Sequence, residues 1–186
     1  MNSYDFERRT AIITGGAQGI GLAVAQRILA SGGSVSIWDR DRALLDKTVE
    51  ALNDIEHVQG LSVDIADLGA VEKATAATLK QFGKIDVLIN NAAIVGPNAA
   101  TWEYPPEAFR DVVTVGLIGT FHCCRAVVPQ MIAQNYGRIC STASLSTGQA
   151  GWSTTLSCGG IVPSEPTGTR ISVMTHPSRE KLWQEP

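Results

Sequence analysis

The segment from Thr14 to Gly21 reads TGGAQGIG and has residue types suited to binding an anion. Glycines permit a tight turn and a close backbone approach, and the N–H groups at the start of a following helix attract negative charge. The glycines at 15, 19 and 21 depart from G-x-G-x-x-G spacing, so the segment alone also fits an ordinary loop. The ligand it would suit is a pyrophosphate, as found in dinucleotides.

Asp39 stands about two dozen residues after the glycine segment, directly after a second apolar run. A carboxylate at this place can accept hydrogen bonds from the adenosine ribose hydroxyls, and it repels a 2′-phosphate. Asp39 therefore favours NAD over NADP, although the neighbouring Arg40 softens that preference. The alternative for Asp39 is a helix N-cap or a solvated acid in a turn.

The elements that would position these residues alternate along the chain. Strand-like runs cover Thr10–Ile13, Ser34–Trp38, His57–Val63, Ile85–Ile89 and Gly137–Cys140, and helix-like segments cover Ile20–Ala30, Arg42–Leu52, Ala66–Phe82 and Pro106–Gln134. The run IDVLI at 85–89 is continuously apolar, as a parallel strand covered on both faces must be. The alternation predicts an α/β fold with a doubly wound parallel sheet and helices on both faces.

This rhythm stops after Cys140. From Ser141 to Ser178, serine, threonine, glycine and proline supply 23 of 38 residues, with neither a helical stripe nor a sustained strand pattern. Such a composition buries too little apolar surface to offset the entropy of ordering. We therefore divide the chain into a nucleotide-binding unit, 1–144, and an irregular tail, 145–186.

Bulk composition narrows the class of partner. With 44% hydrophobic residues, 18% charged residues and a net charge of −3, the chain lacks the basic surface that nucleic acid or an anionic membrane would need. No continuous apolar run has the length of a membrane span, and the first residues lack the build of a signal peptide. The four cysteines lack metal-ligand spacing, so we expect reduced thiols and no metal site. The expectation is a cytoplasmic protein that acts on a small molecule.

Four motifs in order resemble those of the short-chain dehydrogenase/reductase family. They are T-G-x-x-x-G-I-G at Thr14–Gly21, Asp64 after the third strand, FGKID at Phe82–Asp86 and NNAA at Asn90–Ala93. The resemblance covers about Phe6 to Ser144 and is nearest to reductases of 3-oxoacyl carrier-protein thioesters and to related sugar-acid or alcohol dehydrogenases. It implies a Rossmann-like domain that transfers hydride between NAD(P) and an alcohol or ketone. The family has two further strands that the tail does not resemble, so we expect the sheet to be incomplete at its C-terminal edge, with its fifth strand unpaired. The family commonly forms homo-oligomers through the helix at 106–134, but the partner helix of that interface is missing here.

The resemblance also assigns site residues. The cofactor would contact Gly15, Ala17, Gln18, Gly19, Ile20, Gly21, Asp39, Arg40, Asp64, Ile65, Asn91, Ala92 and Ala93. Ser144 stands where the family's catalytic serine stands. The family's tyrosine, in Y-x-x-x-K, is expected at position 157, which is serine, and no Y-x-x-x-K occurs in the chain. Glycine at 116 replaces the family's asparagine.

Three interpretations follow from these losses. The first is an NAD-dependent oxidoreductase by descent whose C-terminal part is truncated or frame-shifted just after Ile139, with catalysis impaired. The second is a non-catalytic dinucleotide-binding remnant or regulatory module, which Gly116 favours because this substitution lies upstream of the break. The third is an unfolded remnant. The substrate itself is not indicated.

Overall fold

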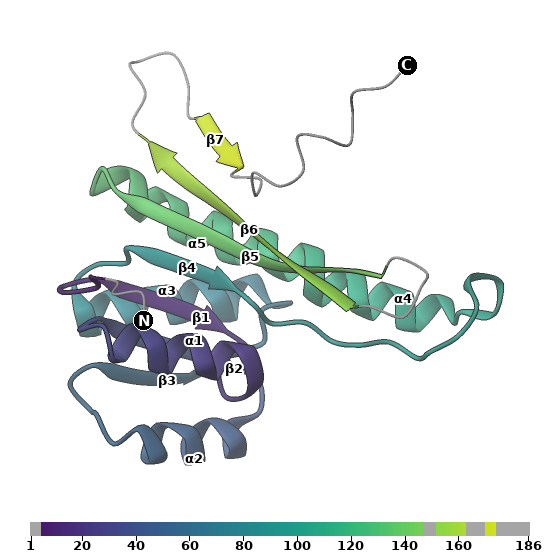
Figure 1. The fold of residues 1–186 in the computed structure, drawn as a ribbon, viewed down its shortest axis with the longest axis horizontal. Coiled ribbons are helices and arrows are strands. Elements are labelled where there is room, and N and C mark those ends of the chain that lie inside the picture. Colours follow the sequence, from purple (N-terminus) through teal and green to yellow (C-terminus); the bar gives the residue numbers. More distant parts are fainter. Residues whose placement is uncertain (1–4, 147–151, 163–169, 174–186) are drawn as a thin grey trace.

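A single twisted sheet organises the part of the chain that the computed structural model describes, residues 5–146, 152–162 and 170–173 (Figure 1). Its parallel strands are β1 (Thr10–Thr14), β2 (Ser34–Asp39), β3 (Val58–Ser62), β4 (Val87–Asn90) and β5 (Gly137–Ser146). Their spatial order is β3-β2-β1-β4-β5, so the chain changes direction across the sheet between β1 and β4. The predicted doubly wound α/β fold is confirmed.

Helices cover both faces of this sheet. The helices α1 (Gly19–Leu29) and α2 (Arg42–Leu52) lie on one face, and α3 (Leu68–Phe82) and α5 (Thr120–Ala133) lie on the other (Figure 1). Because successive strand residues point to opposite faces, β1 serves two cores. Ala11 and Ile13 pack in the core that includes Ala25 and Ile28 of α1, whereas Ile12 packs in the core that includes α3 and α5.

The connection from β4 to β5 contains one long rod. After the short 3-10 turn η1 (Thr101–Glu103), the rod runs through α4 (Pro106–Val113), a π-helical turn η2 (Thr114–Gly119) and α5. The predicted helix over Pro106–Gln134 is therefore confirmed, with the π-helical turn as an unpredicted detail. Such turns often occur at functional sites.

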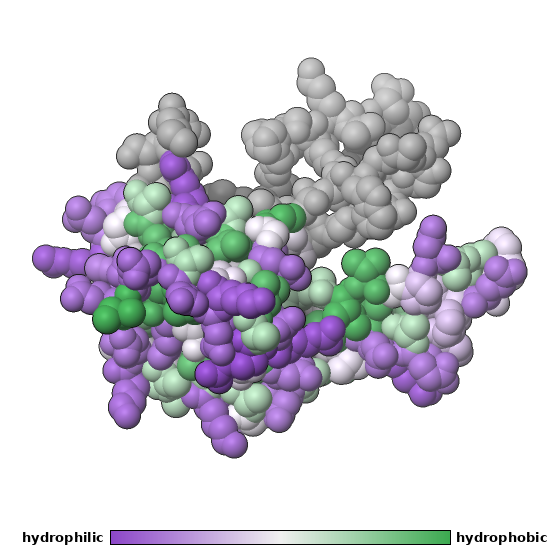
Figure 2. All heavy atoms as spheres, turned by 90° about the horizontal axis from the view of Figure 1, so that it is seen from below, coloured by the Kyte–Doolittle hydropathy of each residue, from purple (hydrophilic) through white to green (hydrophobic). Residues whose placement is uncertain are grey.

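The rod Pro106–Ala133 is also long and apolar enough to cross a membrane by length and composition, with a mean hydropathy of 1.5 over 18 residues. The sequence of the rod is not a continuous apolar run, because polar residues interrupt it. One side of α5 buries Cys123, Val127 and Met131 in the core of the sheet, although only 17% of the 18-residue window is buried. The rod also exposes apolar side chains, namely Phe109, Leu117, Ile118, Phe121 and Ile132. Figure 2 shows apolar atoms gathered on part of the molecular surface.

Two further strands extend the sheet beyond β5. The strand β6 (Trp152–Val162) pairs antiparallel with β5 along its whole length, and β7 (Arg170–Val173) pairs with β6. The expectation of an unpaired fifth strand is wrong, because the unpaired backbone groups of a sheet edge accept any extended segment whatever its side-chain pattern. Both strands fall within the tail expected to be irregular; the rest of that tail, 147–151, 163–169 and 174–186, lies outside the described residues.

Candidate functional site

A cavity of about 380 Å³ opens at the carboxyl ends of β1 to β4. This is where the strand order reverses, the place at which open α/β sheets bind ligands. The lining consists of Gly15, Gln18, Trp38, Asp39, Arg40, Asp41, Val63, Asp64, Ile65, Asn91, Ala92, Ala93, Ile94 and Val115. Most of the predicted cofactor residues therefore meet around one hollow, although they come from four separate loops.

The backbone of the turn after β1 requires glycine. Gly15 and Gly19 have φ of +62° and +57°, a region that other residues rarely adopt. A Cβ on Gly21 would lie 2.4 Å from the Gly15 carbonyl oxygen and 2.7 Å from Asn91 Nδ2. The spacing that departs from the common fingerprint thus still places glycine where this turn needs it.

Asn91 connects that turn to the end of β4. Its side-chain Nδ2 donates to the carbonyl oxygens of Thr14 and Gly15, at 3.1 and 3.0 Å. The hydroxyl Oγ1 of Thr14 accepts from the backbone N–H groups of Asn91 and Ala92, both at 3.0 Å. These four bonds fix the two walls of the cavity that border the reversal point.

Asp39 connects the end of β2 to the same turn. One carboxylate oxygen accepts from Ala17 N at 3.2 Å and the other from Asp41 N at 3.1 Å. The N-cap alternative for Asp39 is wrong, because Asp41 caps α2 by accepting from Leu44 N at 3.0 Å. A carboxylate has room for about four hydrogen bonds, so Asp39 retains acceptor capacity toward the cavity.

The N-terminus of α1 differs from those of its neighbours. Asp41 caps α2 and Asp67 caps α3, whereas Gln18 at the N-cap of α1 makes no side-chain capping bond. The first N–H groups of a helix have no partner within it, so an anion beside this end would be stabilised.

Four of the predicted cofactor residues stand outside the cavity lining. Ala17 is buried and donates its N–H to Asp39, and Gly21 is buried beneath the turn. Gly19 and Ile20 are exposed at the start of α1, where Ile20 keeps 54% of its surface accessible. They shape the turn and the helix end beside the cavity.

Five lining residues were not among those predicted from the sequence. Trp38, Asp41 and Val63 adjoin predicted residues, and Ile94 continues the NNAA motif, so their nearness in sequence was the available signal. Val115 had none, because it belongs to η2, which reaches the cavity only through the fold.

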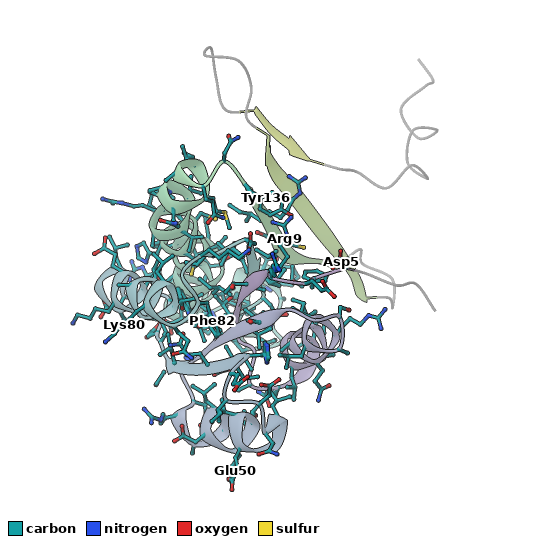
Figure 3. The ribbon with its side chains drawn as sticks, turned by 90° about the vertical axis from the view of Figure 1, so that its left-hand side faces the viewer. Asp5, Arg9, Glu50, Lys80, Phe82 and Tyr136 are labelled. Carbon is teal, nitrogen blue, oxygen red and sulfur yellow. The ribbon has the colours of Figure 1, made fainter. Side chains whose placement is uncertain are left out.

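Among the described side chains, none of the family's catalytic groups lies at the cavity. Ser144 lies in β5 opposite Thr154, but its side chain lies outside the described residues, as does Tyr4. Tyr104 packs edge-on against Phe109, away from the cavity lining. Tyr136 precedes β5, at the opposite end of the strands, with the Arg9 guanidinium 4.0 Å from its ring centre (Figure 3). Neither described tyrosine is placed to replace the missing one.

Gly116, at the family's asparagine position, is exposed within η2. Its carbonyl oxygen accepts from Thr120 Oγ1 at 2.8 Å, and a Cβ built on it meets no atom within 4 Å. Packing therefore does not demand glycine here, and the loss of a side chain at 116 has no steric cause.

The strand order, the helices on both faces and the cavity at the reversal point define a Rossmann-like nucleotide-binding fold. The profile of the short chain dehydrogenase family matches residues 9–156, and the chain belongs to this family of oxidoreductases, which use nicotinamide cofactors. The match extends past Ser144, the last residue of the sequence resemblance, and stops one residue before Ser157.

Individual relatives agree with the family. The 2-dehydro-3-deoxy-L-rhamnonate dehydrogenase (NAD(+)) of Sphingomonas sp. is 42% identical over 138 residues, 74% of this chain and 54% of that protein. The 2-(R)-hydroxypropyl-CoM dehydrogenase of Xanthobacter autotrophicus is 41% identical over 75% of this chain and 57% of that protein. The crystal structure of 3-ketoacyl-(acyl-carrier-protein) reductase from Brucella melitensis with NADH has a TM-score of 0.68 and 30% identity, over 70% of this chain and 53% of that one. The chain spans about half the length of the curated relatives it matches.

Proposed function

We propose that the unit 1–144 binds a nicotinamide dinucleotide, NAD in preference to NADP, in the cavity at the end of the sheet. The observation that carries the proposal is the convergence of the glycine turn, Asp39 and Asn91–Ala93 on one hollow at the reversal point. The uncapped N-terminus of α1 supports it, because the N–H groups there suit a pyrophosphate.

Each wall has a role in this proposal. Asp39 accepts hydrogen bonds from the adenosine ribose, and its charge disfavours a 2′-phosphate, with Arg40 reducing that penalty. Asp64 and Ile65 border the adenine, while Ala92 and Ala93 border the nicotinamide half. The two hydrogen bonds from the Asn91 side-chain amide to the carbonyl oxygens of Thr14 and Gly15 hold the central walls at a fixed separation.

The proposed chemistry is that of the family: the cofactor, when bound, exchanges hydride with an alcohol or ketone. In this chain Ser144 would hydrogen-bond the substrate oxygen. The tyrosine that transfers the proton and the lysine that lowers its pKa are absent, and loss of a positioned general acid costs about 10²- to 10⁴-fold in rate. We therefore propose an oxidoreductase with impaired turnover, a small alcohol or ketone as partner, and the cytoplasm as location.

A non-catalytic dinucleotide-binding module is the second candidate. The open space around Gly116 favours it, since the glycine there removes the family's relay asparagine without any packing requirement. Both candidate functions predict that the chain binds the dinucleotide, but only the oxidoreductase predicts turnover.

The test is a titration of the purified chain with NADH and, separately, NADPH, followed by nicotinamide fluorescence. Saturable binding of NADH, tighter than that of NADPH, supports the proposal, and absence of saturation with either would overturn it. A subsequent assay with NAD and a panel of secondary alcohols separates the candidates. Slow, substrate-dependent NADH formation indicates the impaired oxidoreductase, and none at enzyme concentrations of about 100 μM indicates the binding module.

A further inference from the structure

His122, on α5, contacts the loop that forms one wall of the cavity. Its Nδ1 lies 3.0 Å from the carbonyl oxygen of Ile65, 57 residues earlier in the chain. A carbonyl can only accept, so Nδ1 carries the proton and donates it. Ile65 and the adjacent Asp64 both line the cavity, and Ile65 itself is only 5% exposed. The imidazole thus anchors the backbone of this wall to α5.

Gly119, one turn before His122, contacts the same residue. A Cβ on Gly119 would lie 2.7 Å from Ile65 Cγ1 and 2.8 Å from Cδ1, so glycine lets the Ile65 side chain lie against the helix backbone. One further turn back, Val115 lines the cavity directly. One side of the rod therefore holds the Ile65 side chain and its carbonyl at the same time.

We propose that His122 is a positioning residue for nucleotide binding, which acts by fixing Ile65 and Asp64 at the adenine end of the cavity. The inference rests on the proposed function. The adenine end follows from the order of the walls, because the α1 N-terminus suits the pyrophosphate, Asp39 the ribose, and β3 lies beyond β2. A loosened Ile65 wall would weaken contacts to the adenosine half and leave the glycine turn intact.

The variants are chosen to separate hydrogen bonding from bulk. His122→Leu fills similar space without a donor, whereas His122→Asn keeps an N–H donor near the position of Nδ1. Gly119→Ala disturbs the Ile65 side chain, and Gly116→Ala, on the same rod, adds a methyl group to open space. The readouts are the Kd for NADH, and the Kd for AMP measured by competition with it.

We expect His122→Leu to weaken the binding of both NADH and AMP about threefold to tenfold, the effect of one lost hydrogen bond. Gly119→Ala should also weaken both, because its methyl group displaces the Ile65 side chain. His122→Asn should recover most of the affinity, and Gly116→Ala should match the unaltered chain. Equal affinities in His122→Leu and the unaltered chain overturn the inference, as does a loss of NADH affinity with AMP affinity unchanged.

A second measurement does not depend on the cofactor. The N–H groups of Ala66 and Asp67 donate to Asp64, at 2.9 and 3.1 Å, and report the order of this loop. Their hydrogen exchange should be faster in His122→Leu and close to normal in His122→Asn. If hydrogen exchange in His122→Leu is unchanged, the anchoring by His122 is overturned, whatever the binding result. If exchange in His122→Leu is faster but the unaltered chain does not bind NADH, only the proposed function is overturned.

Discussion

Asn91 shows how much of the site depends on one side chain. Its amide donates to the carbonyl oxygens of Thr14 and Gly15, and these two bonds are the only ones described between the Asn91 side chain and the turn. A carboxylate at this position would face both carbonyls with acceptors only.

We expect Asn91→Asp to lower the free energy of unfolding by about 2–3 kcal/mol and Asn91→Ala by about 1–2 kcal/mol, because the aspartate adds repulsion to the lost bonds. Urea denaturation followed by circular dichroism measures both values. Equal stability of Asn91→Asp and the unaltered chain would contradict the bonding described.

In the proposed site, we expect Asp39 to govern the choice between NAD and NADP. Asp39→Asn removes the negative charge and keeps an oxygen that can accept from Ala17 N or Asp41 N. We expect NADH affinity to fall by about tenfold and the preference over NADPH to narrow, because the repulsion of a 2′-phosphate is lost. Paired fluorescence titrations measure the ratio, and an unchanged NADH to NADPH ratio would count against this role.

The buried thiol of Cys123 makes the folding stability depend on pH. Its side chain is fully buried on α5, and burial raises the pKa of its thiol from 9.0 to about 12. As pH rises above 9, the unfolded chain releases this proton while the folded chain keeps it, so stability falls with pH between about 9 and 12.

At pH 10 the loss from this thiol amounts to about 1.4 kcal/mol relative to pH 8. Urea denaturation at both pH values should show a smaller pH-dependent loss in Cys123→Ala than in the unaltered chain. Identical losses in the two proteins would exclude the contribution of this thiol.

At the scale of elements, the turn from β1 to α1 depends on close backbone contact. Gly21 lies in the first turn of α1 with no space for a Cβ, whereas Gly116 lies in η2 with open space around it. Replacing glycine by alanine at each position therefore distinguishes the effect of packing on stability from the effect of helix propensity.

Gly21→Ala should lower the free energy of unfolding by about 1–3 kcal/mol, because the methyl group displaces Gly15 and Asn91. Gly116→Ala should raise it by about 0.5–1 kcal/mol, since alanine loses less backbone entropy in a helix. Thermal and urea denaturation of both variants provide the comparison. Destabilisation of both to the same extent would show that helix conformation, and not space, requires glycine.

At the scale of the molecule, Asp86 holds together parts of the chain that are distant in sequence. Its side chain is 3% exposed, and its oxygens lie 3.0 Å from Arg9 Nη1 and 3.0 Å from Lys84 Nζ. It also accepts from Thr10 N at 2.9 Å, and Arg9 stacks over Tyr136 just before β5 (Figure 3). One buried carboxylate thus connects the starts of β1, β4 and β5, at the end of the sheet away from the cavity.

Asp86→Asn keeps the bond to Thr10 N and loses both ion pairs. We expect a loss of about 1–3 kcal/mol, moderated because both cations are more than a third exposed and regain water. NADH affinity should stay unchanged, since the cavity lies at the other end of the strands. Urea denaturation and the NADH titration test the two parts, and a variant with normal stability but weakened binding would contradict this separation.

Local signals in the sequence were sufficient for the fold of residues 10–140. Apolar runs and helical spacing identified β1 to β5 and their helices, because each pattern depends on residues within one element. The glycine turn and Asp39 were identifiable for the same reason, since turn geometry and strand-end positions are local properties. Asn91 was identified through the resemblance of its NNAA motif to that of the family.

The remaining features depend on contacts between elements. Val115 reaches the cavity, His122 reaches Ile65, and β6 pairs with β5 only because the sheet brings these segments together. No periodicity records such pairs, since a histidine on a helix has the same local pattern whether it faces solvent or a loop 57 residues away. Residue types and spacing determined which groups could bind a dinucleotide, and the packing of α5 across the sheet decided how the wall of that site is held.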